Sequence, residues 1–279
     1  MGVAVKNIEI HKVSASGTEL GDDLLAVEEP LEIRVGFGPL NDRQQKSLSV
    51  TMRTPGHDFE LALGFLFTEG IIQSFHQVES IKYCDDVGRA EEKENVVRVE
   101  LKPEVQLDVQ KLQRNFYTTS SCGVCGKSSI EAVKVYCETL AVNWSVKADI
   151  VHALPVKLRE AQRVFEHTGG LHASGLFNVQ GELVLLREDI GRHNALDKVV
   201  GAMLVNGELP LSNYILLVSG RTSFELVQKA ARAGIPLLAG VGAPSSLAVS
   251  LAKDFIMTLL GFVRNGKFNI YSGLERIDE

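Results

Sequence analysis

The sequence is poor in aromatic residues and has no excess of positive charge. Aromatic residues make up 6% of the 279 residues, with a single tryptophan, so a stacking platform for single-stranded nucleic acid is not expected. The 29 basic residues are outnumbered by 35 acidic residues, which gives a formal net charge of −6. Binding through nucleic-acid phosphates needs a basic surface, so we expect no nucleic-acid partner.

Long apolar runs and export signals are also lacking. The best apolar run, residues 256–263, falls well short of the roughly 18 residues that a membrane-spanning helix needs, so no membrane association is expected. The first residues have no apolar core of the kind that marks a secretory signal. Four cysteines in a chain of this length do not form a disulfide framework, so we expect a cytoplasmic protein.

The first part of the sequence has the pattern of strands with one helix among them. Residues 59–68 are apolar on nearly every side, Asp58 is a candidate N-cap, and Gly70 stands where a helix would end. We therefore predict a β-rich N-terminal domain over residues 1–116 with one buried helix. Residues 117–147 are predicted to form a loop of small residues and a connecting helix.

Residues 148–279 alternate between helical and strand patterns, which predicts a layered α/β domain. Gln180-Gly181 between two apolar runs indicates a hairpin, and residues 214–218 have the composition of a buried strand. One helical face is predicted from apolar residues at helical spacing, namely Leu154, Leu158, Ala161 and Phe165.

Cys122-Gly-Val-Cys125 is the strongest chemical signal in the sequence. Such a pair is typical of a metal site, a dithiol redox site, or a cysteine that carries sulfur. A persulfide carrier needs an exposed cysteine on a backbone free to move, which Gly123 and Gly126 favour, and thiolate character, which Lys127 favours. Sulfur transfer is therefore the preferred interpretation, with Cys122 as the nucleophile and Cys125 as its partner.

The other interpretations of this pair stay open. A structural zinc site needs four ligands, and the remaining cysteines, Cys84 and Cys137, have no partner at the usual spacing. A thioredoxin-like site would lie in an early βαβ unit behind an aromatic residue, whereas here Ser120-Ser121 precedes the pair. Two inert thiols on a loop are the remaining alternative.

The C-terminal half also lacks the zinc-ligand residues of a class of proteins whose order of elements is similar. Its order of hairpin, helix, strand and helix is similar to that of the zinc deaminases, whose signature is H-x-E at one helix start and P-C-x-x-C at the next. The corresponding places here, residues 192–195 and 220–224, hold neither the glutamate nor the cysteines. We therefore predict no metal site and no deamination.

Small and polar residues at these places indicate anion binding. Ser219-Gly-Arg-Thr-Ser223 and residues 240–246 each lie between a strand and a helix, where free N–H groups attract phosphate, and Asn265-Gly-Lys267 follows near the C-terminus. Plain strand-to-helix connections remain the alternative. His193 is crowded by polar residues, which favours a role in a site, and His172 precedes the predicted hairpin.

Together these motifs resemble the formate dehydrogenase accessory sulfurtransferase family, FdhD. The resemblance rests on Cys122–Gly126, Glu188–Lys198, Ser219–Arg221 with Phe224–Lys229, and Gly261–Lys267, and residues 63–72 also fit. It covers nearly the whole chain in the same order, and it implies a cytidine-deaminase-like three-layer C-terminal domain without the zinc site.

The resemblance implies a function as well. The protein would accept sulfur from a cysteine desulfurase as a persulfide on Cys122. It would then pass the sulfur to the molybdenum bis(molybdopterin guanine dinucleotide) cofactor before the cofactor enters the catalytic subunit of formate dehydrogenase. GDP would mimic part of this substrate, no metal ion would be held by the protein itself, and a homodimer is compatible with this function.

The resemblance also implies which residues bind the cofactor. The family's binding segment corresponds to residues 262–267, which end in Lys267 where arginine would be equally expected. The predicted cofactor-binding residues are Phe262, Val263, Arg264, Asn265, Gly266, Lys267, Ser219, Arg221, His172, Arg192 and His193. The alternatives are a cofactor-binding chaperone without sulfur chemistry and a dithiol redox protein.

Overall fold

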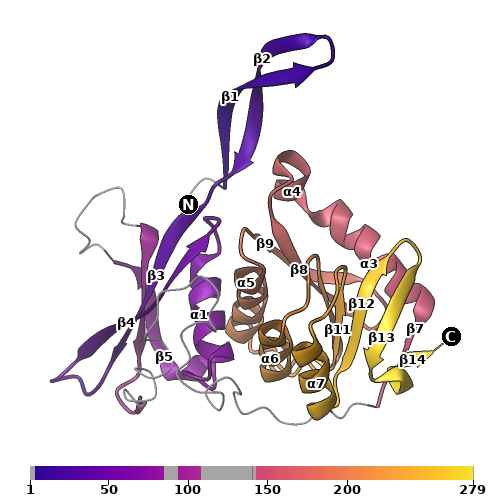
Figure 1. Ribbon diagram of the computed structural model, residues 1–279. Coiled ribbons are helices and arrows are strands. Elements are labelled where there is room, and N and C mark those ends of the chain that lie inside the picture. The colour runs from indigo at the N-terminus through magenta and orange to yellow at the C-terminus, as the bar shows by residue number, and fades with distance from the viewer. Residues whose placement is uncertain (1–3, 85–93, 108–139, 141–142, 279) are drawn as a thin grey trace.

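The computed structural model describes residues 4–84, 94–107, 140 and 143–278 (Figure 1). The pair Cys122 and Cys125 lies outside these residues, as does most of the segment predicted at 117–147. No helix in the described part of the chain is long and apolar enough to cross a membrane.

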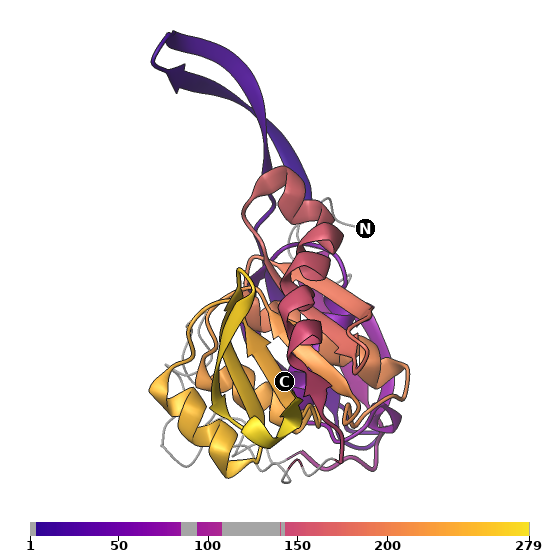
Figure 2. The same cartoon turned by 90° about the vertical axis from the view of Figure 1, so that its right-hand side faces the viewer.

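The N-terminal part contains a protruding hairpin and a four-stranded sheet. The hairpin strands β1 (Val5–Ser14) and β2 (Gly17–Ala26) pair along their whole length and project away from the rest of the molecule (Figure 2). The sheet has the order β4-β3-β6-β5, in which β3 and β6 run parallel. Its strands are β3 (Glu29–Phe37), β4 (Gln44–Arg53), β5 (Val78–Tyr83) and β6 (Val96–Leu101).

The predicted buried helix is present as α1 (Asp58–Thr68). It packs between the four-stranded sheet and the C-terminal part, which explains why it is apolar all round (Figure 1). The prediction that Asp58 caps this helix was wrong: His57 occupies the N-cap position, and the Asp58 carboxylate accepts two hydrogen bonds from the buried Arg53 guanidinium. Gly70 follows the helix with φ 74°, as predicted.

The C-terminal part is built on a six-stranded sheet of order β13-β12-β11-β10-β8-β9. Neighbouring strands β10, β11 and β12 are parallel, and the other pairs are antiparallel. The strands are β8 (His172–Asn178), β9 (Leu183–Asp189), β10 (Tyr214–Val218), β11 (Leu237–Gly240), β12 (Thr258–Arg264) and β13 (Lys267–Ser272). A short parallel pair, β7 (Val146–Lys147) with β14 (Ile277–Asp278), lies beside it.

Helices cover both faces of this sheet, so the predicted mixed α/β class is confirmed. Apolar residues of α3 (Ala148–Ala161) pack on one face, followed by the short helix α4 (Arg163–Thr168). The opposite face is covered by α5 (Arg192–Val205), α6 (Phe224–Arg232) and α7 (Ser246–Asp254), beyond which lies α1 (Figure 1).

The two parts share one hydrophobic core where α1 crosses α5. A Cβ atom added to Gly64 would lie 1.8 Å from the Asp197 carbonyl oxygen, and one added to Gly201 would lie 1.9 Å from the Glu60 carbonyl oxygen. Only glycine permits this close approach of the two backbones.

Candidate functional site

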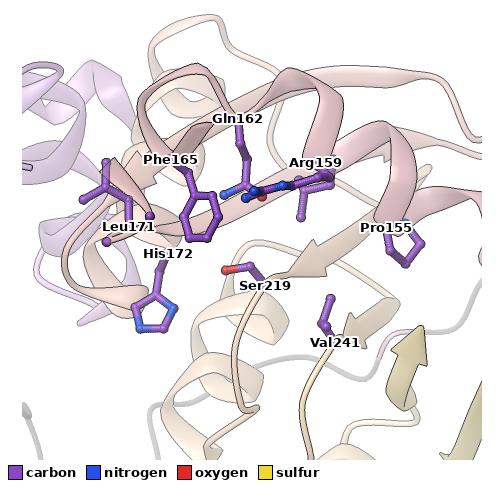
Figure 3. A pocket seen from close by; sticks show the side chains of 11 residues that line it. Pro155, Arg159, Gln162, Phe165, Leu171, His172, Ser219 and Val241 are labelled. Carbon is purple, nitrogen blue, oxygen red and sulfur yellow. The ribbon is translucent and has the colours of Figure 1, made fainter. Parts of the chain in front are cut away.

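A pocket of about 430 Å³ lies between the α3–α4 corner and the edge of the sheet where β10 and β11 end (Figure 3). Its size is within the usual range for small-molecule sites. Pro155, Leu158 and Leu171 give it apolar walls, and His172 and Ser219 face it from the sheet edge.

His172 and Ser219 are brought together by the pairing of β8 with β10. Ser219 Oγ accepts a hydrogen bond of 2.9 Å from the Ala173 N–H, and the Ser219 hydroxyl still has a proton to donate. A Cβ atom on Gly220 would lie 3.2 Å from His172 Nδ1, so glycine gives the imidazole room. Burial, and then the charge of Arg192, lower the pKa of His172, which keeps the ring neutral at pH 7.

Arg192 and His193 open helix α5 beside this pocket. Arg192 Nε is buried without a hydrogen-bond partner in the described part of the chain. The His193 ring shares a hydrogen bond of 3.1 Å with Ser223 Oγ at the start of α6. Burial, followed by the charges of Lys229 and Arg192, lowers the pKa of His193 to about 3, so His193 is neutral and its 3.9 Å contact with Glu225 is not an ion pair at pH 7.

These residues form a region suited to an anion. We call His172 and Ser219, which line the pocket, together with Arg192 beside it, the anion end. Arg192 supplies positive charge, and Gly191 and Ser223 give α5 and α6 no side-chain cap. Uncapped N–H groups at helix starts favour phosphate and carboxylate groups.

The loops that follow β10 and β11 are bonded to each other and to strand β12 at the same edge of the sheet. The Gly242 N–H donates to the Gly220 carbonyl at 3.1 Å, and the Phe262 N–H donates to the Gly242 carbonyl, also at 3.1 Å. Thr222 N–H donates to the Ala243 carbonyl. The carboxyl edge of parallel strands is a frequent ligand site, and these bonds hold the loop backbones there in one arrangement.

Side chains of residues 188–198 hold the starts of α4 and α5 in place beside the pocket. The Glu188 carboxylate accepts hydrogen bonds from the backbone N–H groups of Val164 and Phe165, at 3.1 and 2.9 Å, and so anchors the start of α4. The Asp189 carboxylate accepts from the Gly191 N–H at 2.8 Å and from Asn194 Nδ2 at 3.0 Å, which sets the first turn of α5.

Comparison with known proteins places this arrangement in a family. The model of the FdhD/NarQ family matches residues 26–278. The chain belongs to the FdhD/NarQ family. It is 46% identical to a protein of Streptomyces avermitilis over 99% of this chain and 97% of that one, and 44% identical to one of Saccharolobus solfataricus over 99% and 100%. Both are named sulfur carrier protein FdhD, as is a Mycolicibacterium paratuberculosis protein that is 52% identical over 91% of this chain and 92% of its own.

The fold of the family is also found in a solved structure. A formate dehydrogenase accessory protein assigned in Desulfotalea psychrophila superimposes with a TM-score of 0.74 at 24% identity, covering 99% of this chain and all of that one. At this level of identity the likeness shows a shared fold.

The predicted FdhD/NarQ site residues do not all lie together. His172 and Ser219 line the pocket, and Arg192 and His193 lie beside it, whereas Arg221 is exposed on the loop after Gly220. In the segment 262–267, Asn265 and Gly266 have φ of 54° and 67° and form the tight turn between β12 and β13. The role of this segment in cofactor binding stays a prediction.

Of the pocket residues, only His172 and Ser219 were predicted as site residues from the sequence. Among the others are Arg159, Gln162 and Phe165, which we call the helix corner. The apolar stripe that ends at Phe165 predicted one continuous helix, but the chain breaks at Gln162, between α3 and α4. The break turns Gln162 and Phe165 toward the pocket (Figure 3). The apolar stripe itself runs through this break without interruption, so the local sequence pattern gave no signal of it.

Proposed function

We propose that this protein is a sulfur carrier in formate dehydrogenase maturation. Cys122 accepts sulfur from a cysteine desulfurase, and the sulfur then goes to the molybdenum bis(molybdopterin guanine dinucleotide) cofactor before the cofactor enters the enzyme. Membership of the FdhD/NarQ family and the names of the relatives support this function. The observation that carries it in this chain is the pocket, which combines apolar walls with an anion end and so suits a nucleotide-bearing substrate.

The sulfur chemistry is a sequence of two exchanges. The Cys122 thiolate attacks the terminal sulfur of the desulfurase persulfide, an S–S bond forms on Cys122, and the desulfurase cysteine leaves as a thiolate. Attack of the Cys125 thiolate on Cys122 then releases the terminal sulfur as sulfide and closes a Cys122–Cys125 disulfide, so the two thiols supply the two electrons. An external thiol would have to reduce this disulfide before the next cycle.

The anion end is proposed to hold phosphate groups of the substrate's guanine nucleotide. Arg192 supplies a charge-assisted donor, while neutral His172 and Ser219 supply uncharged donors. GDP would bind there as a partial mimic. Residues 262–267 and Arg221 are proposed to contact other parts of the cofactor.

We further propose that the C-terminal layers are a deaminase-like fold that has lost its metal. The two places at which zinc deaminases hold their ligands correspond here to the starts of α5 and α6, and His193 and Ser223 join these places by a 3.1 Å hydrogen bond. Elemental analysis of the purified protein should find well under one zinc per chain. Stoichiometric zinc that disappears in Cys122→Ser would instead assign the cysteine pair to a metal site.

The function is tested by incubating the protein with a cysteine desulfurase and cysteine and measuring its intact mass. One added sulfur atom is expected on Cys122, removable by a thiol reductant, and none is expected in Cys122→Ala. The same variant should fail to restore formate dehydrogenase activity in cells that lack the native protein. Cys125→Ala should lose less, because an external thiol can attack the Cys122 persulfide in place of Cys125. GDP binding should be nearly unchanged in both variants.

This experiment also separates the two other functions. Full maturation activity in Cys122→Ala would favour a chaperone that holds the cofactor without sulfur chemistry. Equal and complete loss in both variants, with a reversible disulfide and no added sulfur in the wild type, would favour a dithiol redox protein.

A further inference from the structure

The hairpin formed by β1 and β2 has no buried residue in either strand. Among the described strands, β1 and β2 pair only with each other, and they project away from the rest of the molecule (Figure 2). An isolated two-stranded hairpin is marginally stable in water, and exposed strands are places where another chain can dock. The hairpin lies almost entirely outside residues 26–278, which the family model matches, so its role is not part of what that model describes.

One face of the hairpin combines exposed apolar side chains with an acidic pair. The register of the strands places Val13, Leu20 and Leu24 on this face, where they are 78, 61 and 38% exposed. Glu9 stands directly opposite Asp22 on the same face, and neither carboxylate has an ion-pair partner in the described part of the chain. Like charges directly opposite each other on paired strands are unfavourable, so a cation placed between them would be bound favourably. We call these five residues the arm face.

The opposite face of the hairpin has balanced charge. Its charged side chains are two lysines and two acidic residues, namely Lys6, Lys12, Glu19 and Asp23. Lys12 stands directly opposite Glu19, and its side chain lies across Gly21, where a Cβ atom would be 3.3 Å from Lys12 Cε. The unbalanced acidic charge of the hairpin is therefore confined to the arm face.

The base of the hairpin reaches the rim of the pocket. Ala26 is on the same side of β2 as Leu24, and its Cβ would lie 3.9 Å from a Cβ atom on Gly170, which lines the pocket. Strand β2 also contacts α4, which follows the corner that forms one wall of the pocket. A protein docked on the arm face would therefore stand beside the pocket.

We propose that the arm face is the docking surface for the protein that receives the cofactor from the pocket, and that this protein meets it with a basic side chain flanked by apolar ones. The basic group lies between Glu9 and Asp22, and the apolar groups cover Val13 and Leu20. In the proposed function, on which this choice of partner rests, the recipient is the catalytic subunit of formate dehydrogenase. A second copy of this chain is a poorer partner, because in a two-fold pair the acidic face would meet itself.

The test is the affinity of the full-length protein for the cofactor-free catalytic subunit, measured by biolayer interferometry at physiological ionic strength. Asp22→Lys should weaken binding by about tenfold or more, because it sets a positive charge against the basic group of the partner. The same change replaces a like-charged cross-strand pair by an oppositely charged one. A role of Asp22 in holding the hairpin together therefore predicts no loss of binding.

Asp23→Lys is the matched control, because it makes the same change of charge at the next residue but on the opposite face. Its affinity should stay within about twofold of the wild type, since solvent ions screen charges that are more than about 8 Å apart. Asp23 Oδ1 accepts a hydrogen bond of 2.9 Å from the Leu24 N–H. General loosening of the hairpin would therefore appear in the control and not in Asp22→Lys.

Leu20→Asn tests the apolar part of the arm face. It should weaken binding of the catalytic subunit by about tenfold, because the leucine side chain is buried in the complex. Leu274→Asn is its control: Leu274 is similarly exposed, at 67%, and lies in the short turn before β14, near the C-terminus.

Three results would overturn the proposal. The first is a catalytic subunit that does not bind the wild type, or binds Asp22→Lys as tightly as Asp23→Lys. The second is a smaller oligomer of Asp22→Lys in analytical ultracentrifugation with unchanged binding of the subunit, which would assign the arm face to a second copy of the chain. The third is weaker binding of cysteine desulfurase, and not of the subunit, by Asp22→Lys.

Failure of the docking surface and failure of the proposed function give different results. If Cys122 takes up sulfur but Asp22→Lys and Leu20→Asn bind the subunit normally, only the docking surface is wrong. If the subunit binds through the arm face but Cys122 takes up no sulfur, the docking surface stands and the sulfur-carrier function fails.

Discussion

Lys198 and Asp189 form an ion pair, Nζ to Oδ2 at 2.7 Å, in which both side chains are almost completely shielded from solvent. The pair joins α5 to the end of β9, and Lys198 Nζ also donates to the Thr54 carbonyl at 2.9 Å. The Thr54 N–H donates to Asp189 Oδ2 at 3.2 Å. The residue that follows β4 of the N-terminal sheet is thereby bonded directly to the segment that carries Arg192.

Lys198→Met should lower the free energy of unfolding by about 3–5 kcal/mol, because it leaves the Asp189 carboxylate buried without its cation. Urea unfolding followed by circular dichroism measures this. Lys253→Met, on the exposed side of α7, is the matched control and should stay within about 0.5 kcal/mol. A small effect in Lys198→Met would mean that water or another cation replaces the lost charge.

Gly201→Ala tests the crossing of α1 and α5. The added methyl group would collide with the Glu60 carbonyl at 1.9 Å, so the helices must separate, at a cost of about 3 kcal/mol or more in unfolding free energy. Gly170→Ala is the control, since its Cβ would meet only ordinary contacts at 3.8 Å and beyond. Thermal unfolding of both variants distinguishes a packing constraint from a general preference for glycine.

Local patterns predicted most strands and helices because side-chain periodicity is imposed by burial on each element separately. Strand β10 has the predicted bounds, and α1 ends at the predicted residue but begins one residue earlier than predicted. Gly70 and Gly234 have positive φ after their helices, at 74° and 79°, because a C-terminal turn selects glycine locally.

Contacts between distant residues account for what the sequence did not show. Asp58 would cap α1 in an isolated helix, but Arg53 captures its carboxylate inside the core. The stripe through Phe165 continues past Gln162 in the sequence, yet Glu188, more than 20 residues away, bonds the backbone that starts a new helix. The helix corner therefore exists only once β9 is in place, and no local pattern could reveal it.

His193 should make the protein lose stability as the pH falls. Burial lowers the pKa of His193 from 6.5 to about 3, so between these values the unfolded chain binds a proton that the folded chain does not. The stabilisation is complete above pH 6.5 and declines as the pH falls toward 3. From pH 7 to pH 5, the wild type should lose roughly 1–2 kcal/mol more unfolding free energy than His193→Gln. Urea unfolding at several pH values measures the difference, and parallel curves for the two proteins would contradict it.

Arg192 and Arg221 should differ in how they affect anion binding. Arg192 has a buried Nε without a partner in the described chain, whereas Arg221 is exposed. Arg192→Gln should weaken GDP and pyrophosphate binding alike by about 1.5–3 kcal/mol, because a charge-assisted hydrogen bond is lost in a site shielded from water. Arg221→Gln should weaken the binding of both ligands by about 1 kcal/mol at low ionic strength. This loss of binding free energy should shrink as salt is added, because solvent ions screen an exposed charge.

Lys82→Gln in β5 is the control, because it removes one positive charge far from the pocket and should leave both affinities unchanged. Calorimetric titrations at two salt concentrations separate the two arginines. If the Arg192 effect falls with salt as steeply as the Arg221 effect, Arg192 acts from a distance through its field and does not bond the phosphate.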